Sequence, residues 1–174
     1  MSSARLVKTA AEQEFIAFVR AHGRALARTA TLIAGDATAG EDLLQTALAR
    51  TYVRWTTAAD IEDLEAYVRV VLVRAHISWR RRLSSTELVR DVAPEELTAP
   101  DIADRLVDRG LLLGALQKLP PKQRAALVLR YFDDLSEADT AAALGCSAGS
   151  VKQHTSRGLA RLRQLLGAEA AVLP

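Results

Sequence analysis

The chain has 174 residues, of which 49% are hydrophobic and only 5% aromatic, and its formal net charge is +2. This length allows one ordinary domain or two small ones, and the apolar fraction is large enough for a buried core. The single cysteine, Cys146, excludes a disulfide framework within the chain, and no apolar run reaches the roughly 18 residues of a membrane span. Residues 1–10 lack the apolar core of a signal peptide, so we expect a cytoplasmic protein without membrane insertion.

Charge is divided into blocks along the chain. Residues 67–82 contain five arginines and no acidic residue, and residues 147–166 contain four basic residues and no acidic one. Between these two basic blocks, residues 86–109 contain seven acidic residues and three arginines. The arrangement of the charge therefore says more about binding partners than the small net value does.

Three helices are predicted in the first half of the chain. Apolar residues recur at spacings of three and four over 12–33 and again over about 40–56. A third helix, over about 62–82, begins with acidic residues and ends with arginines, an order that suits the helix macrodipole. The residues that lie off the apolar stripe of the second helix are Glu41, Asp42, Gln45 and Ala49.

The third predicted helix has one polar face and a dense basic end. Arg69, His76 and Arg80 are spaced seven and four residues apart, so they share a face. The consecutive arginines Arg80, Arg81 and Arg82 predict that the C-terminal end of this helix binds phosphate. The residues of this helix that we expect in the core are Leu64, Tyr67, Val71 and Ala75.

Residues 83–110 differ in character, because they contain Pro94, Pro100 and the acidic block without a long apolar pattern. We predict a linker with short helical turns at most. A second helical module is predicted from Leu111. A further helix over about 121–132 begins at a proline that suits the first helical position.

A helix-turn-helix is predicted near the C-terminus. Ser136 and Asp139 form a candidate capping box for its first helix, and Gly145 suits the left-handed cap at which that helix ends. Ala141, four residues before Gly145, is small enough for close approach of the two helices. Val151, six residues after Gly145, supplies the apolar side chain between them.

The second helix of this motif has an apolar and a polar face. At about 100° per residue, the apolar face comprises Val151, Thr155, Gly158, Leu162, Leu165 and Leu166. The polar face comprises Lys152, Gln153, Ser156, Arg157, Ala160, Arg163 and Gln164, with His154 and Arg161 on its flank. Arginine, lysine and glutamine side chains suit the phosphates and base edges of DNA. An isolated basic face is usually solvated surface, but the tight turn favours DNA contact here.

These segments together resemble the extracytoplasmic-function branch of bacterial sigma factors. The resemblance rests on GDATAGEDLLQTALARTYVRW (35–55), DLEAYVRVVLVRAHISWRRR (63–82) and LQKLPPKQRAALVLRYFDDLSEADTAAALGCSAGSVKQHTSRGLARLRQLL (116–166). The order and spacing of the three segments are more specific than any one of them. The Trp-Arg-Arg-Arg end of the second segment is similar to a subgroup common in actinobacteria.

The resemblance implies an all-α initiation subunit of RNA polymerase that has no catalytic chemistry and no cofactor. A domain similar to sigma region 2, over 12–82, would bind core RNA polymerase and the minus-ten element. An acidic linker over 83–110 would either thread toward the polymerase active centre or act as a plain tether. A helix-turn-helix domain similar to region 4, over 111–168, would bind the minus-thirty-five element. Core RNA polymerase and promoter DNA are the implied partners, and an anti-sigma factor is a further candidate.

The resemblance also implies roles for individual residues. The implied contacts with polymerase are Glu41, Asp42, Gln45 and Ala49, although a solvated helix start would look the same. The implied contacts with the minus-ten element are Arg69, Arg74, His76, Trp79, Arg80 and Arg81. The implied contacts with the upstream element are Ser150, Lys152, Gln153, His154, Arg157 and Arg161.

The roles of two of these residues, Arg74 and Trp79, are left open. Many relatives have Asn where this chain has Arg74, so we transfer no base preference for the minus-ten element. Trp79 would either stack on an unpaired base or, as is more usual for a single tryptophan, pack against the first helix.

Two alternative functions explain less of the sequence than a sigma factor does. A free-standing helix-turn-helix regulator that binds an operator would account for 111–166 only. A helical enzyme or adaptor has no supporting group of residues. His22, His76 and His154 lie on three different predicted helices, so we expect no metal site. Cys146 is expected to be a small packed residue in the turn.

Overall fold

The computed structural model describes residues 2–57, 61–85 and 103–166, which form helices joined by short turns. The helices are α1 (Ser2–Ala34), α2 (Ala37–Thr57), α3 (Leu64–Ser85), α4 (Ala103–Gln117), α5 (Pro121–Leu127), the π-helical turn η1 (Val128–Phe132), α6 (Glu137–Leu144) and α7 (Ala148–Leu166). No β-strand occurs in these three ranges, and the all-α prediction is confirmed.

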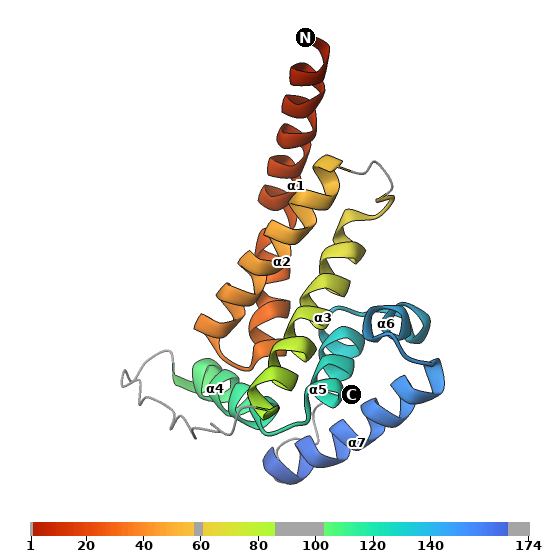
Figure 1. Cartoon of the computed structure of the whole chain (residues 1–174). Coiled ribbons are helices and arrows are strands. Elements are labelled where there is room, and N and C mark those ends of the chain that lie inside the picture. Colours follow the sequence, from red (N-terminus) through yellow and green to blue (C-terminus); the bar gives the residue numbers. More distant parts are fainter. Residues whose placement is uncertain (1, 58–60, 86–102, 167–174) are drawn as a thin grey trace.

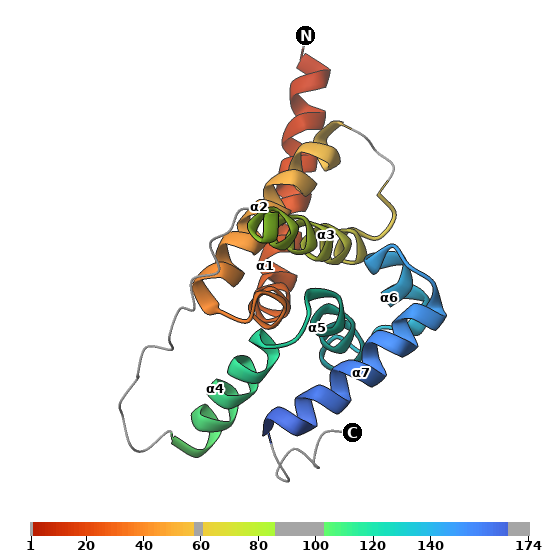
Figure 2. The same cartoon turned by 60° about the horizontal axis from the view of Figure 1, so that its bottom comes forward.

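The first three helices lie side by side and alternate in direction (Figure 1). We call α1–α3 the first half of the molecule and α4–α7 the second half. Figure 2 shows α5 between the first half and α7, with α6 beside α3. The two halves therefore pack directly against each other, and we call the surface where they meet the seam.

One apolar core runs through both halves. Leu26 and Leu72 of the first half are fully buried, and so are Leu116 and Leu129 of the second. All four belong to a single cluster of packed side chains that extends from α1 to α7. The helices that the sequence assigns to separate domains thus share one continuous interior.

Short polar side chains cap the starts of α2 and α3. Asp36 accepts a hydrogen bond from the backbone N–H of Ala39 at 2.7 Å and so caps α2. Asp63 accepts from the N–H of Ala66 at 2.9 Å at the start of α3. Each cap satisfies a backbone donor that the helix leaves without an internal partner. At α5, Pro121 occupies the first helical position, as the sequence predicts.

Two expectations about helix boundaries and faces differ from the structure. α4 begins at Ala103, within the predicted linker 83–110, because good helix formers there are interleaved with charges that hide the periodicity. The remainder of that linker, 86–102, lies outside the described residues.

In α3 the core residues are Val68, Leu72, Val73 and Ala75. Of the four predicted, only Ala75 is buried, because α3 is covered on two sides and has no single apolar stripe.

The close approach of α1 and α2 at Gly40 gives a first prediction. A Cβ atom at Gly40 would lie 2.6 Å from the backbone Cα of Thr31, so Gly40→Ala should lower the free energy of unfolding by about 1–3 kcal/mol. Gly114→Ala is the matched control, since nothing lies within 4 Å of its added methyl group. That variant should be neutral or stabilising by up to about 1 kcal/mol. Urea unfolding of both variants measures the difference, and equal stability would contradict the close contact.

Candidate nucleic-acid interface

The helix-turn-helix is built as its sequence predicts. The hydroxyl oxygen of Ser136 accepts a hydrogen bond from the N–H of Asp139 at 3.0 Å. The same hydroxyl donates to the Asp139 carboxylate at 2.5 Å, in place of the second backbone bond of a full capping box. Gly145 ends α6 at a φ of 63°, and Val151 is fully buried between α6 and α7. These contacts fix the angle at which α7 leaves the turn.

The packed face of α7 is narrower than predicted. Val151, Gly158 and Leu162 are buried, and a Cβ at Gly158 would lie only 3.0 Å from Leu127 of α5. Leu165, which we expected to pack, is 37% exposed because it lies in the last turn of α7. The face opposite the packed one is exposed. It comprises Lys152, Gln153, Ser156, Arg157, Ala160, Arg161, Arg163 and Gln164.

The exposed face of α7 carries Lys152, Arg157, Arg161 and Arg163 and no acidic residue, which favours an anionic partner. The ammonium group of Lys152 lies 3.5 Å from the carboxylate of Glu137, but both side chains are well exposed and such a pair is weak. Burial, followed by the charges of Lys122 and Arg157, lowers the pKa of His154, which favours the neutral form of its imidazole. The half-buried Ser150 contacts Ser147 rather than solvent alone.

A hollow of about 290 Å³ beside α7 contains basic residues that the sequence analysis did not select. Arg130 of η1 and Arg163 of α7 line it together with Lys152. Arg130 also donates to the backbone carbonyl of Leu135, which orients its guanidinium. Only the fold brings Arg130 next to α7, so helical spacing alone could not have found it.

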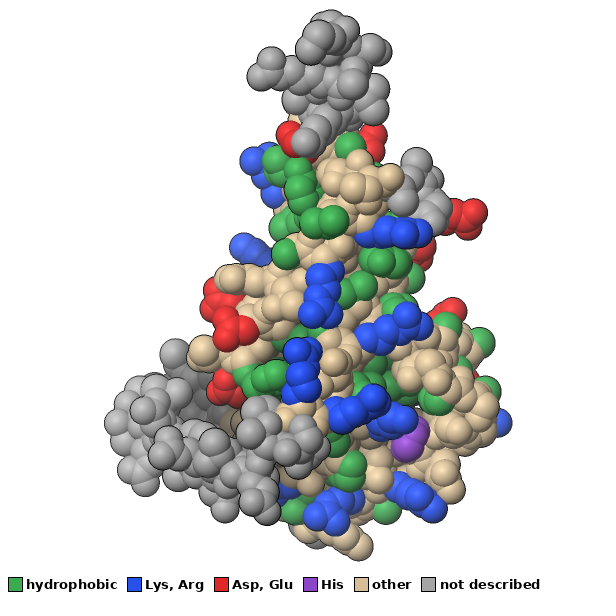
Figure 3. All heavy atoms as spheres, viewed as in Figure 1, with side chains coloured by type: hydrophobic (Ala, Val, Ile, Leu, Met, Phe, Trp, Pro, Cys, Tyr) green, Lys and Arg blue, Asp and Glu red, His purple; other side chains and the backbone are tan. Residues whose placement is uncertain are grey.

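The predicted polymerase-contacting face of α2 is exposed. Leu43 and Ala47 pack into the core and turn the opposite side of the helix outward. Figure 3 shows acidic side chains gathered at the edge of the molecule that α2 forms, and basic ones in a band over α2 and α3. The outward residues are Glu41, Asp42, Gln45 and Ala49.

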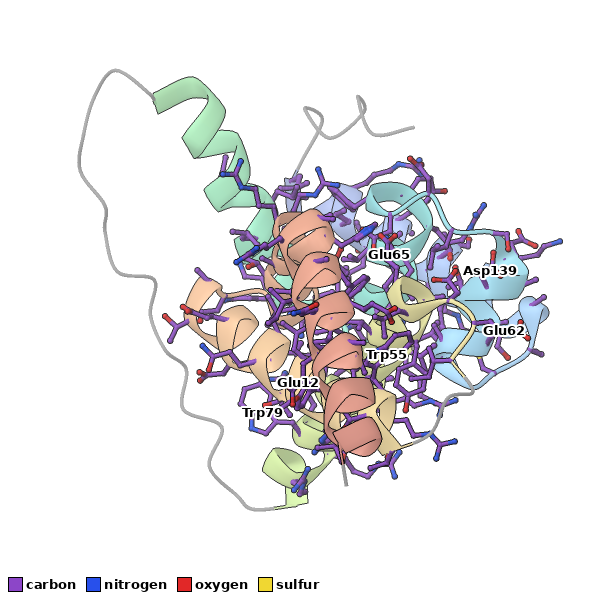
Figure 4. All side chains as sticks on the ribbon, turned by 90° about the horizontal axis from the view of Figure 1, so that it is seen from above. Glu12, Trp55, Glu62, Glu65, Trp79 and Asp139 are labelled. Carbon is purple, nitrogen blue, oxygen red and sulfur yellow. The ribbon has the colours of Figure 1, made fainter. Side chains whose placement is uncertain are left out.

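Several side chains of α3 are exposed between its middle and its C-terminal end. Arg74 is exposed midway along the helix, Arg80 and Arg81 are exposed near its end, and Trp79 is 44% exposed. Trp79 lines a hollow between α2 and α3, so the expected packing against the first helix is wrong. Figure 4 shows Trp79 on the side of the molecule away from α6 and α7.

Two other residues of α3 predicted to face DNA lie in the seam instead. His76 is fully buried, and its Nε2 accepts a hydrogen bond from the guanidinium of Arg124 at 3.1 Å. Arg69 pairs with Glu65 at 2.5 Å and with Asp133 at 3.2 Å, and its side chain is 15% exposed. Because the second half covers this face of α3, neither side chain is available to DNA in this arrangement.

Asp133 is the centre of a second polar contact across the seam. The hydroxyl of Thr29 in α1 donates to its carboxylate at 2.7 Å, and Arg69 of α3 reaches it from the other side. Burial raises the pKa of Asp133, although Thr29 and Arg69 act in the opposite direction. Asp133 directly follows the π-helical turn η1. The next residue, Asp134, has a left-handed backbone conformation with a φ of 52°.

The seam also leaves buried polar groups unsatisfied. Arg124 is 1% exposed, its Nε has no hydrogen-bond partner, and no carboxylate among the described residues pairs with it. Nδ1 of His76 is likewise without a partner. Each buried donor left in this state costs about 1–3 kcal/mol. The closed packing of the halves therefore carries an internal penalty.

The described residues suggest no metal site and no membrane span. Within them, no three His, Cys, Asp or Glu side chains come close enough to hold a metal ion. Nor does any helix in that part of the chain have the length and apolar character needed to cross a membrane.

Together, a helix-turn-helix with a basic outer face and a helical half with exposed arginines define a DNA-binding transcription protein. The family described as Sigma-70, region 4 matches residues 109–162. The chain is 43% identical over 153 residues to the RNA polymerase sigma-E factor of Streptomyces coelicolor, covering 88% of this chain and 86% of that protein. It is 32% identical to the ECF RNA polymerase sigma factor SigM of Mycobacterium tuberculosis, covering 85% of this chain and 74% of that protein.

The chain belongs to the RNA polymerase sigma factors, and its function is that of a sigma factor in transcription initiation. Sigma factors bind core RNA polymerase and promoter DNA. The relatives match well beyond 109–162, so a free-standing helix-turn-helix regulator is not favoured.

Solved structures show the same fold. The sigma factor RpoE of Bartonella quintana, in complex with the anti-sigma factor NepR, superimposes with a TM-score of 0.68 at 24% identity. That match covers 90% of this chain and 99% of the other. CnrH, in complex with the cytosolic domain of CnrY, gives a TM-score of 0.60 at 24% identity over 94% of both chains.

Burial of His76 gives a prediction about stability and pH. Burial, then the charges of Arg124 and Arg80, lowers its pKa from 6.5 to about 3, so only the unfolded chain protonates it between these values. The free energy of unfolding should therefore fall on acidification, by about 2 kcal/mol from pH 7.5 to pH 5 for this residue. His76→Gln should remove that part of the pH dependence.

Urea unfolding of both proteins at both pH values measures this effect. The raised pKa of Asp133 acts in the opposite sense, but it is common to the two proteins and cancels in the comparison. Equal pH dependence of wild type and His76→Gln would show that His76 is not held neutral in the fold.

Proposed function

We propose that the exposed face of α7 reads the upstream promoter element, while the outward face of α2 binds core RNA polymerase. The observation that carries this proposal is the separation of faces on α7. Val151 and Leu162 of α7 are buried in the core, and the cations on the opposite face have no structural task in it. A basic helix held in this way by a tight turn is suited to the major groove.

Residues on α7 would divide the work between base reading and phosphate contact. The planar fork of Arg157 can donate to two acceptors on one guanine, whereas Lys152 is a point charge suited to phosphate. Arg130 and Arg163, which line the same hollow as Lys152, would add further phosphate contacts. The upstream-element set is thus Ser150, Lys152, Gln153, His154, Arg157 and Arg161, extended by these two arginines.

The minus-ten element would be bound by the exposed end of α3. Arg74, Trp79, Arg80 and Arg81 are accessible as the structure stands. Arg69 and His76 would join them only if the second half moved off α3. The proposed division of the chain is 12–82 for the domain that binds polymerase and the minus-ten element, 83–110 for the linker, and 111–168 for the upstream-element domain.

The proposal extends to the setting in which the protein works. The chain would have no catalysis of its own, since polymerase performs the chemistry, and it would act in the cytoplasm with that enzyme. The solved structures that share its fold are complexes, one with the anti-sigma factor NepR and one with the cytosolic domain of CnrY. Their complexes support an anti-sigma factor as a candidate partner of this chain.

Two substitutions on α7 test the proposed division of its work. Arg157→Ala should cost about 1–3 kcal/mol of promoter binding and relax the preference at one position of the upstream element. Lys152→Ala should weaken binding evenly across sequences and lower the salt slope by about one. The assay compares upstream-element variants at several salt concentrations, using holoenzyme.

Arg24→Ala is the matched control, because it removes an exposed arginine from α1, far along the chain from α7. It should leave both the base preference and the salt slope unchanged. If the two α7 variants behave like this control, the exposed face of α7 does not read DNA.

The α2 surface is tested by combining Asp42→Lys with Gln45→Ala. Both side chains are exposed, so this variant should keep its helix content but bind core polymerase about tenfold or more weakly, if these residues form part of the interface centre. Glu14→Lys combined with Gln13→Ala makes a similar change on the exposed face of α1 and should leave binding unaffected. Affinity for fluorescently labelled core polymerase and far-ultraviolet circular dichroism are the two measurements. Undiminished affinity in the α2 variant would remove this surface from the proposal.

A further inference from the structure

One acidic residue lies among the cations of the hollow beside α7. Arg130, Lys152 and Arg163 line this hollow, and Glu137 of α6 lines it with them. Glu137 is the only acidic residue among the described residues that form its wall. DNA presents one negative charge per about 1.7 Å of its axis. Glu137 therefore repels the partner that its neighbours attract.

Glu137 has a favourable place in the free protein. It is the first residue of α6, where the helix dipole favours a negative charge. Its carboxylate also lies 3.5 Å from the ammonium group of Lys152 on α7. The side chains of Glu137 and Lys152 are 39% and 67% exposed, so their pairing adds little to the stability of the fold. The main consequence of this contact is therefore expected when DNA binds.

The start of α6 lies where the backbone of bound DNA would pass. In a helix-turn-helix, the first helix crosses the sugar-phosphate backbone and the second helix enters the major groove. Since α6 is the first helix, a carboxylate at its start is expected beside phosphates rather than beside base edges. A phosphate that approaches Lys152 then competes with Glu137 for the ammonium group and is repelled by the same carboxylate.

We propose that Glu137 competes with a DNA phosphate for Lys152 and thereby weakens the binding of the upstream element. This inference rests on the proposed function of α7 in binding DNA. Because phosphate contacts carry no sequence information, the competition lowers the affinity for every sequence alike. The free protein is then held less firmly on unrelated DNA, whereas in holoenzyme the contacts of polymerase and of the minus-ten element add to those of α7. Stable binding thus depends on the complete holoenzyme.

Glu137→Gln tests the competition, because it removes the negative charge and keeps the size of the side chain. Holoenzyme with this variant should bind promoter fragments about three- to tenfold more tightly, evenly across upstream-element variants. The salt slope should become steeper by up to about one, since Lys152 would be free to displace a counterion. A folding defect would weaken binding, so it cannot imitate this result. Unchanged or weaker binding would overturn the proposal.

The free full-length chain tests the consequence for unrelated DNA. At low salt, Glu137→Gln should bind a duplex without promoter elements about three- to tenfold more tightly than the wild type does. A gain that is confined to promoter DNA would contradict a competition for phosphate.

A double-mutant cycle with Lys152→Ala tests whether Glu137 acts through Lys152. In the Lys152→Ala background, Glu137→Gln should change the affinity by about twofold or less. An effect as large as in the wild type would mean that Glu137 repels DNA without involving Lys152. An altered preference at a single base pair would mean that Glu137 reads a base. Either result would overturn the competition for Lys152.

Glu14→Gln is the matched control, since it makes the same chemical change on the exposed face of α1. It should leave the affinity and the salt slope unchanged. If Lys152→Ala weakens binding but Glu137→Gln does not strengthen it, only the competition is wrong. If neither Lys152→Ala nor Arg157→Ala changes binding, α7 does not contact DNA, and the proposed function fails together with this inference.

Discussion

The burial of one cation, Arg124, constrains how the two halves of the molecule pack. The guanidinium of Arg124 lies in the seam, where it contacts the carbonyl of Leu116 at 3.3 Å and the neutral ring of His76. Burial and the nearby charge of Arg80 lower the pKa of Arg124 to about 10, so it stays charged near pH 7. Its hydrogen bonds compensate part of the cost of burying this charge, and the packing of the apolar core around it offsets the rest. The seam is therefore stable through its apolar packing and weakened by its polar groups.

The packing at the seam explains why one part of α3 is buried and another part is exposed. Its middle turns pack on both halves, so Arg69 and His76 are drawn inward although their spacing is that of a polar face. In its last turns the side chains of Arg80 and Arg81 remain exposed. The middle turns of α3 thus belong to the core, and its last turns belong to a basic surface.

Local features could be predicted from the sequence because they depend on neighbouring residues. The caps at Ser136 and Gly145 and the faces of α7 follow from spacing within a few turns. The burial of His76 could not be predicted, since it depends on Arg124, which is 48 residues away in the chain. The same holds for Arg130, because no helical pattern places η1 beside α7. Periodicity describes one helix at a time, and the seam is a property of two halves.

The polar groups of the seam limit how tightly the two halves can pack. Arg124 and His76 each leave a buried nitrogen without a hydrogen-bond partner, and each such group costs about 1–3 kcal/mol. No carboxylate among the described residues pairs with Arg124, so its charge is buried without compensation by an opposite charge. The packing of the two halves therefore depends on the apolar core that they share.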